Sequence, residues 1–155
     1  MRTAEVKRTT RETDISLAVD LDGTGKAEIG TGVGFFDHML ELLAVHSHMD
    51  VTLSCKGDLQ VDAHHTVEDV GIALGDCVKT ALGTKRGIAR FADRLVPMDE
   101  VAAQVAIDFS GRPCLIFEDT LTGKVGNFDM ELVEEFLRAF STHAACNLYV
   151  RILRM

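Results

Sequence analysis

An internal repeat limits the fold of this chain more than any other feature of its sequence. Two segments align without gaps at a constant offset of 97 positions, each an apolar, helix-like run followed by a short β-like run. The aligned pairs are Met39-Leu40 with Phe136-Leu137, Leu43 with Phe140, His46 with His143, and Val51 and Leu53 with Leu148 and Val150. Self-similarity at a fixed offset indicates a repeated structural unit, so we expect two similar halves, residues 1–86 and 87–155.

Apolar periodicity predicts the elements of each half. Alternation with period two indicates half-buried strands, and apolar positions three and four apart indicate helices. Turn residues at 22–25 predict a hairpin returning from the first strand, and 113–118 is expected to form a hairpin with 101–109. Strands in hairpins, with a helix after each group, favour an α+β fold with mainly antiparallel sheets. The expected strands are 13–21, 26–29, 51–53, 101–109, 113–118 and 147–153, and the expected helices are 35–48, 66–82 and 129–143.

Composition excludes several classes of function. Sixteen Lys and Arg residues against twenty-four Asp and Glu leave a net charge of −8, which repels nucleic acid and anionic membranes. No apolar run approaches the ~20 residues that span a bilayer, and the first residues lack a signal-peptide core. The four cysteines form no C-x-x-C pair, so a disulfide framework or cysteine zinc site is not indicated. We therefore expect a reduced, cytoplasmic, globular protein.

The segment Asp62–Asp69, with the sequence DAHHTVED, is the strongest candidate for chemistry. On a helix, Glu68 shares a face with His64, four positions earlier, or with His65, three positions earlier. The two histidines diverge by roughly 100°, which favours two neighbouring metals, or metals shared between subunits, over chelation of one ion. Imidazole and carboxylate ligands suit Mn, Fe or Zn. Asp62 and Asp69 are expected to accept hydrogen bonds that fix the imidazole tautomers; the alternative is a capped, polar helix start with surface histidines.

Two further groups are candidates for a site. His38 lies at the start of an apolar helix, where it is either a ligand or a core or cap residue, and Glu135 occupies its repeat position. A basic cluster that includes Arg90 and Arg112 can hold one phosphate or carboxylate through bidentate arginine contacts. Lys85 and Arg86 are expected to lie in a solvated loop.

Several segments together resemble one family. They are Arg11-Glu12-Thr13, residues 34–40 (GFFDHML), residues 62–69, residues 87–91 (GIARF), residues 97–100 (PMDE) and residues 108–113 (DFSGRP). In this order they are similar to imidazoleglycerol-phosphate dehydratase of histidine biosynthesis, over essentially the whole chain. The resemblance implies a duplicated half-domain of the ribosomal protein S5 domain 2-like type. It also implies trimers assembled into a large octahedral homo-oligomer, with a two-manganese site between subunits.

The resemblance also implies roles for individual residues. Glu12 matches the catalytic acid/base, and Arg90 and Arg112 match the residues that grip the substrate phosphate. Glu135 stands where many members have His and others Glu. The implied ligands of the two Mn(II) ions are His38, His64, His65, Glu68 and Glu135.

The second half is expected to be incomplete at its C-terminus. The counterpart of His64-His65 would fall at position 161, beyond Met155, whereas members of the family continue through a second H-H-x-x-E helix. The implied activity is dehydration of D-erythro-imidazoleglycerol phosphate to imidazoleacetol phosphate. The alternatives are a metal-dependent phosphatase or hydrolase, and a non-catalytic, oligomeric metal-binding remnant.

Overall fold

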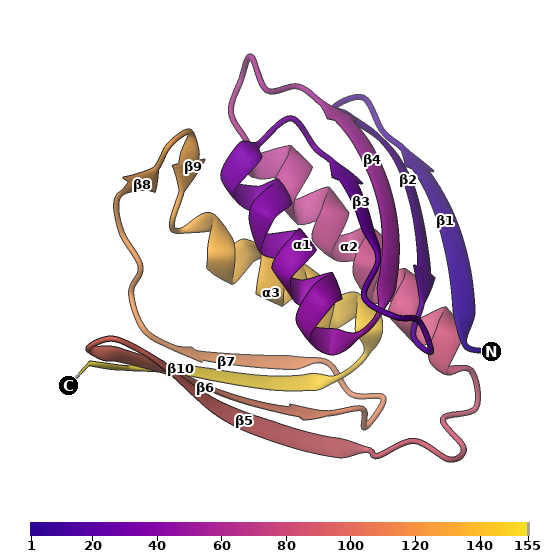
Figure 1. Ribbon diagram of the computed structural model, residues 1–155. Helices are drawn as coiled ribbons and strands as arrows, with labels where there is room; N and C mark the ends of the chain where they lie inside the picture. Colours follow the sequence, from indigo (N-terminus) through magenta and orange to yellow (C-terminus); the bar gives the residue numbers. More distant parts are fainter. Residues whose placement is uncertain (155) are drawn as a thin grey trace.

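Two four-stranded sheets enclose three helices in the computed structural model, which describes residues 1–154 (Figure 1). The helices are α1 (Gly34–Ser47), α2 (His64–Leu82) and α3 (Leu132–Ala144). Helices α1 and α2 pack on the first sheet, and α3 contacts the second. This arrangement confirms the expected α+β class and the duplicated half-domain.

The first sheet has the strand order β1-β2-β4-β3. Strands β1 and β4 pair antiparallel with β2, whereas β3 runs parallel to β4. Inward-facing side chains of β2 form the core with α2; Ile15 and Leu17 are each 1% exposed, and Val67 is fully buried. The strands are β1 (Thr3–Thr9), β2 (Thr13–Asp20), β3 (Ala27–Gly30) and β4 (Asp50–Gly57).

The second sheet has the equivalent order β5-β6-β10-β7. Strands β5 and β10 pair antiparallel with β6, and β7 runs parallel to β10. A small antiparallel hairpin of β8 and β9 lies between β7 and α3. The strands are β5 (Phe91–Met98), β6 (Val101–Asp108), β7 (Cys114–Glu118), β8 (Lys124–Val125), β9 (Phe128–Asp129) and β10 (Asn147–Arg154).

Two expected hairpins are wrong. Strand β3 does not pair with β2, and β7 does not pair with β6. In each half the last strand, β4 or β10, is inserted between them and takes their hydrogen bonds. The observed hairpins are β1–β2 and β5–β6, and the periodicity predicts neither of their edge strands, because β1 is mostly polar and β5 contains Pro97.

The repeat is confirmed, with one insertion. Strand β4 begins at residue 50 and β10 at residue 147, the expected 97 positions later. Strands β2 and β6 begin at residues 13 and 101, only 88 positions apart. The difference arises between the third strand and the helix, where the second half contains the β8–β9 hairpin. The two halves therefore share one topology.

Helices α2 and α3 approach each other closely because α2 contains two glycines. A Cβ at Gly71 would lie 2.9 Å from the carbonyl oxygen of Phe136, and a Cβ at Gly75 would lie 2.7 Å from the Cβ of His143. Glycine in a helix interior costs about 1 kcal/mol relative to Ala. Here that cost allows the backbones of the two halves to pack together.

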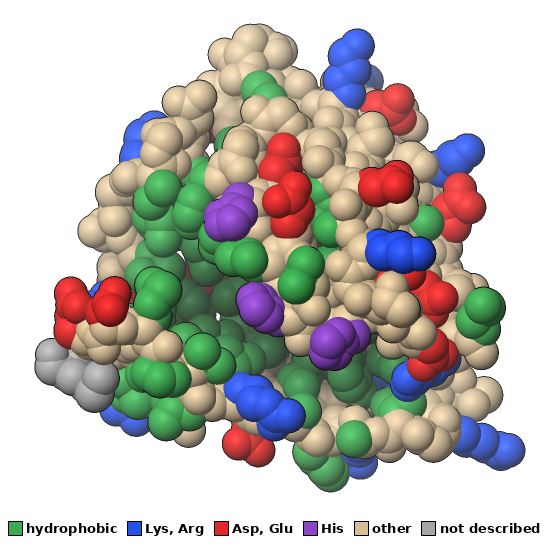
Figure 2. Space-filling view, viewed as in Figure 1, with side chains coloured by type: hydrophobic (Ala, Val, Ile, Leu, Met, Phe, Trp, Pro, Cys, Tyr) green, Lys and Arg blue, Asp and Glu red, His purple; other side chains and the backbone are tan. Residues whose placement is uncertain are grey.

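An apolar groove separates the helices from the second sheet. Its volume is about 590 Å³, and Figure 2 shows the apolar side chains that surround the hollow. In the first half, α2 covers β1 and β2; among residues 1–154, no helix covers β5 and β6 in the same way. The groove therefore occupies the place in the second half that α2 occupies in the first half. Its lining includes Leu43, Val78, Ile107, Phe136, Phe140 and Leu148.

Candidate active site

The histidines of the DAHHTVED segment lie in the first turn of α2. Asp62 accepts a hydrogen bond from the backbone N–H of His64 at 2.8 Å, which satisfies one free donor of the helix start. The rings of His64 and His65 lie 6.2 Å apart, and their planes are inclined by 78°. The Nε2 of His64 lies 3.8 Å from the Oε2 of Glu68. The start of α2 therefore presents two imidazoles and one carboxylate.

Asp58, just after β4, orients His65. Its Oδ2 lies 2.9 Å from Nδ1 of His65, and this hydrogen bond, more than any other contact, raises the pKa of the histidine. The charges of Asp58, Glu12 and Asp62 act in the same direction. An imidazole held at Nδ1 keeps Nε2 as its free nitrogen, the arrangement that second-shell carboxylates give to metal-bound histidines.

The sequence interpretation assigned this orienting role to other residues. The expectation that Asp62 and Asp69 fix the imidazole tautomers is wrong, because Asp62 accepts from a backbone N–H and Asp69 accepts from Arg8 and Thr13. Asp58 was missed because it lies outside the motif, seven positions before its partner. A carboxylate directly after a strand that precedes such a motif is the signal that could have identified it.

Glu12 lies in the turn between β1 and β2. Its backbone N–H donates to the hydroxyl of Thr10 at 3.1 Å, and its side chain is partly exposed. Because Thr13 pairs with Gly57 across β2 and β4, the turn of Glu12 lies at the same end of the first sheet as Asp58, which holds His65. An acid/base candidate and a metal-ligand candidate thus lie near each other.

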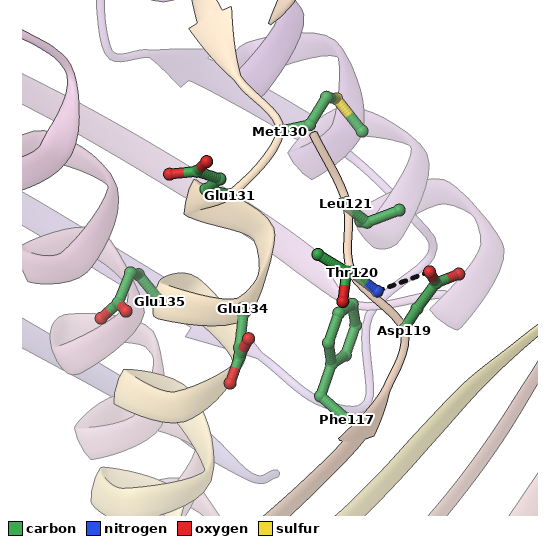
Figure 3. Close-up of a pocket in the computed structure, with 8 residues that line it drawn as sticks. All are labelled: Phe117, Asp119, Thr120, Leu121, Met130, Glu131, Glu134 and Glu135. Carbon is green, nitrogen blue, oxygen red and sulfur yellow. Dashed lines mark hydrogen bonds between the residues drawn. The ribbon is translucent and has the colours of Figure 1, made fainter. Parts of the chain in front are cut away.

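The remaining ligand candidates lie elsewhere on the chain. His38 is exposed on α1. Glu135 lies on α3 and lines a pocket of about 300 Å³ (Figure 3). Within residues 1–154, no three His, Cys, Asp or Glu side chains converge closely enough to hold one metal ion. The pocket of Glu135 is lined by Phe117, Asp119, Thr120, Leu121, Met130, Glu131 and Glu134.

The two candidate phosphate ligands belong to the second half, near Asp108 at the end of β6. Arg90 donates to Asp108 from Nε at 2.6 Å and from Nη2 at 3.1 Å, and this guanidinium holds the pKa of Asp108 below its usual value. The charges of Arg112 and Lys85 lower that pKa further. Lys85 also donates from Nζ to the carbonyl oxygen of Phe109 at 3.0 Å, so it is anchored beside this cluster. The expectation that Lys85 lies in a solvated loop is therefore wrong.

Together these features define a class of protein: an α+β enzyme of two homologous halves with a histidine–glutamate motif of metal-ligand type. The family model described as imidazoleglycerol-phosphate dehydratase matches residues 31–155. The chain belongs to this family, which consists of hydro-lyases of histidine biosynthesis. In the part that the structure describes, no helix is long and apolar enough to cross a membrane.

Individual relatives agree with this assignment. The chain is 58% identical over 154 residues to an imidazoleglycerol-phosphate dehydratase of Methylorubrum extorquens, covering 99% of this chain and 79% of the relative. A Rhodopseudomonas palustris relative of the same name is also 58% identical, with 99% and 78% covered. The crystal structure of the Staphylococcus aureus dehydratase matches with a TM-score of 0.88 at 36% identity, over 99% of this chain and 85% of that one. A Pyrococcus furiosus structure matches with a TM-score of 0.78 at 27% identity, over 97% and 80%.

Proposed function

We propose that this chain dehydrates D-erythro-imidazoleglycerol phosphate to imidazoleacetol phosphate, using two Mn(II) ions per active site. The observation that carries the proposal is the first turn of α2, where Asp58 holds His65 at 2.9 Å, at the end of the first sheet that also carries the turn of Glu12. We also propose that the reaction takes place in the cytoplasm.

The donor set fits manganese. His64, His65 and Glu68 offer two imidazoles and a carboxylate, ligands that suit divalent first-row metals. Because successive positions on a helix point about 100° apart, each histidine would serve a different ion, and His38 and Glu135 would supply further ligands. When bound, manganese supplies Lewis-acid stabilisation of negative charge on the imidazole ring of the substrate.

Glu12 acts as the acid/base in this proposal. The hydrogen that is lost lies on a carbon of the glycerol side chain without an adjacent carbonyl, so a positioned carboxylate is required to accept it. Glu12 projects from a turn held by hydrogen bonds from its own N–H and that of Thr13 to the hydroxyl of Thr10. Proton transfer by such a side chain contributes typically about 10²- to 10⁴-fold to the rate.

Arg90 and Arg112 bind the phosphate of the substrate. Two nitrogens of Arg90 are occupied by Asp108, and the rest of the guanidinium is free to donate. The side chain lies over the ring of Phe91, 4.9 Å from its centroid, which limits its rotation. Holding the phosphate at a fixed point orients the reacting carbons and lowers the entropic part of the barrier.

The site is shared between copies of the chain. The ligand candidates do not converge within residues 1–154, and a ligand set divided over separate surfaces is completed by association. We propose trimers that assemble into a large octahedral homo-oligomer, in which α2 of one copy meets α1 or α3 of another.

The products separate this function from its alternatives. The purified protein is incubated with manganese and imidazoleglycerol phosphate, and imidazoleacetol phosphate and inorganic phosphate are measured in the same sample. Dehydration predicts the first product without release of phosphate. Release of phosphate identifies a phosphatase, and absence of both products from a manganese-loaded oligomer identifies a non-catalytic metal-binding protein.

A further inference from the structure

A buried carboxylate in the second turn of α2 connects this helix to both strands that flank Glu12. The Oδ1 of Asp69 accepts hydrogen bonds from Nε and Nη2 of Arg8, at 3.2 and 2.9 Å. The Oδ2 accepts a hydrogen bond from the hydroxyl of Thr13 at 2.5 Å. Asp69 and Thr13 are only 7% and 3% exposed. We call Arg8, Thr13 and Asp69 the Asp69 network.

The position of this network follows from the periodicity of the elements. Side chains alternate across a strand, so Arg8 continues the inward-facing row of β1, and Thr13 begins the inward-facing row of β2. Asp69 lies on the face of α2 that packs against these strands. Charged groups are rarely buried without a partner, and both oxygens of Asp69 have one.

The turn that carries Glu12 lies between the two anchored positions. Thr10 donates its N–H to the carbonyl of Thr13 at 2.8 Å. The hydroxyl of Thr10 accepts the N–H groups of Glu12 and Thr13, at 3.1 and 3.0 Å. The turn is therefore rigid in itself, and the Asp69 network is its connection to the helix.

The residue that precedes Asp69 on α2 belongs to the proposed site. Glu68, one residue before Asp69, faces outward beside His64, whereas Asp69 faces the strands. The first turn of α2 lies close against β4 as well, because a Cβ at Gly57 would overlap the hydroxyl of Thr66. The helix start is thus fixed against the sheet, and the turn is fixed against the helix start.

We propose that the Asp69 network positions the carboxylate of Glu12 relative to His64, His65 and Glu68. Asp69 itself is a positioning residue, since its buried oxygens are taken by Arg8 and Thr13 and do not reach a substrate. This inference rests on the proposed function of Glu12. It adds Arg8, Thr13 and Asp69 to the residues on which turnover depends.

Thr13→Val tests the inference with the least disturbance, because valine keeps the shape of threonine and removes the hydroxyl that donates to Asp69. Thr13→Ser keeps that hydroxyl and serves as the rescue. Thr9→Val is the matched control, since the hydroxyl of Thr9 donates at 2.8 Å to Asp14 on the exposed side of the same hairpin. The melting temperature and manganese content of each variant are measured with kcat and KM.

We expect Thr13→Val to lower kcat about ten- to a hundredfold with KM within about twofold, because small misplacement of a reacting group is costly. Thr13→Ser and Thr9→Val are expected to retain kcat within about threefold. In the Glu12→Gln background, Thr13→Val is expected to have no further effect on kcat. Independently of turnover, amide exchange of Glu12 and Thr13 is expected to become about tenfold faster in Thr13→Val.

Two results would overturn the inference: wild-type kcat and amide exchange in Thr13→Val, or equal loss of kcat in Thr13→Val and Thr9→Val. Additive losses in the Glu12→Gln background would also contradict it, because Thr13 would then act independently of Glu12. Failure of the proposed function has a different signature. In that case Glu12→Gln keeps full activity, or the wild-type protein forms no imidazoleacetol phosphate, while the exchange measurement still reports on the network.

Discussion

The Nδ1 atom of His65 lies 2.9 Å from the Oδ2 atom of Asp58, and this pair links the end of β4 to the first turn of α2. A second pair of this kind joins α3 to α2, where Nδ1 of His143 on α3 lies 3.0 Å from Oδ1 of Asp76 on α2. Only the first of these pairs belongs to the proposed site. Asp58 and Asp76 therefore provide a variant and its control, because each carboxylate holds a histidine at Nδ1.

Asp58→Asn is expected to weaken manganese binding about 10- to 100-fold, because removal of a partner that orients a ligand has an effect of this size. Asp76→Asn is expected to leave manganese affinity unchanged. Titration of the metal-free proteins followed by elemental analysis or calorimetry measures both. Equal affinities for Asp58→Asn and the wild type would contradict the assignment of His65 as a ligand.

The same pair predicts a pH dependence of stability in the metal-free protein. Asp58 raises the pKa of His65 above 6.5, so the pair stabilises the fold fully below that pH. Its contribution declines as the pH rises through the raised pKa of the folded state. The difference in melting temperature between wild type and Asp58→Asn should therefore be larger at pH 5.5 than at pH 8.5. A difference that grows towards alkaline pH would contradict this.

Alanine at each ligand candidate of α2 should reduce the metal content. The intact protein is expected to hold up to two manganese ions per subunit, and His65→Ala to lose at least one. His46→Ala is a suitable control, since His46 lies in the last turn of α1 and has no assigned role. Unchanged metal content in His64→Ala, His65→Ala and Glu68→Ala would overturn the ligand assignment.

The apolar groove predicts the behaviour of a polypeptide limited to residues 1–155. Exposed apolar area of this extent, which continues on the same face of β5 with Val96 and Met98, favours association. Such a polypeptide should bind an apolar dye. A polypeptide that continues through the remaining length of the relatives should bind less of the dye. A polypeptide of residues 1–155 that is monodisperse and binds no dye would contradict the prediction.

The reactivity of the cysteine thiols tests how completely the core excludes solvent. Burial raises the pKa of Cys55, Cys77 and Cys146 to about 11, whereas Cys114, at the start of β7, is exposed. A thiol reagent at pH 8 should therefore modify one cysteine per chain rapidly and the other three only on unfolding. Cys114→Ser should abolish the fast phase. Two or more fast thiols in the folded wild type would show that the core is less closed than described.

Periodicity predicts the helices and inner strands well because these elements bury one face against a common core. It fails for β1 and β5, whose edge positions allow polar residues and, in β5, Pro97. It also fails for the pairing of β3 and β7, since the order of strands depends on where the last strand of each half is inserted. Local pattern carries no information on that insertion.

Prediction from local sequence pattern has the same limit at the candidate site. Spacing on a helix predicts that His64 and Glu68 share a face, and the structure places their side chains 3.8 Å apart. It does not reveal Asp58 or the contact of Asp69 with Arg8, because these residues lie outside the helix, 7 and 61 positions before their partners. The roles of Glu12, Arg90 and Arg112 came from family resemblance and stay predictions.

The acid/base role of Glu12 is the central claim, and the kcat of Glu12→Gln tests it most directly. We expect kcat for the formation of imidazoleacetol phosphate to fall by about 10²- to 10⁴-fold, with manganese content and KM close to wild type. Glu28→Gln, on exposed β3, should retain wild-type kcat. A Glu12→Gln protein that turns over within about twofold of the wild type would contradict the proposed reaction centre.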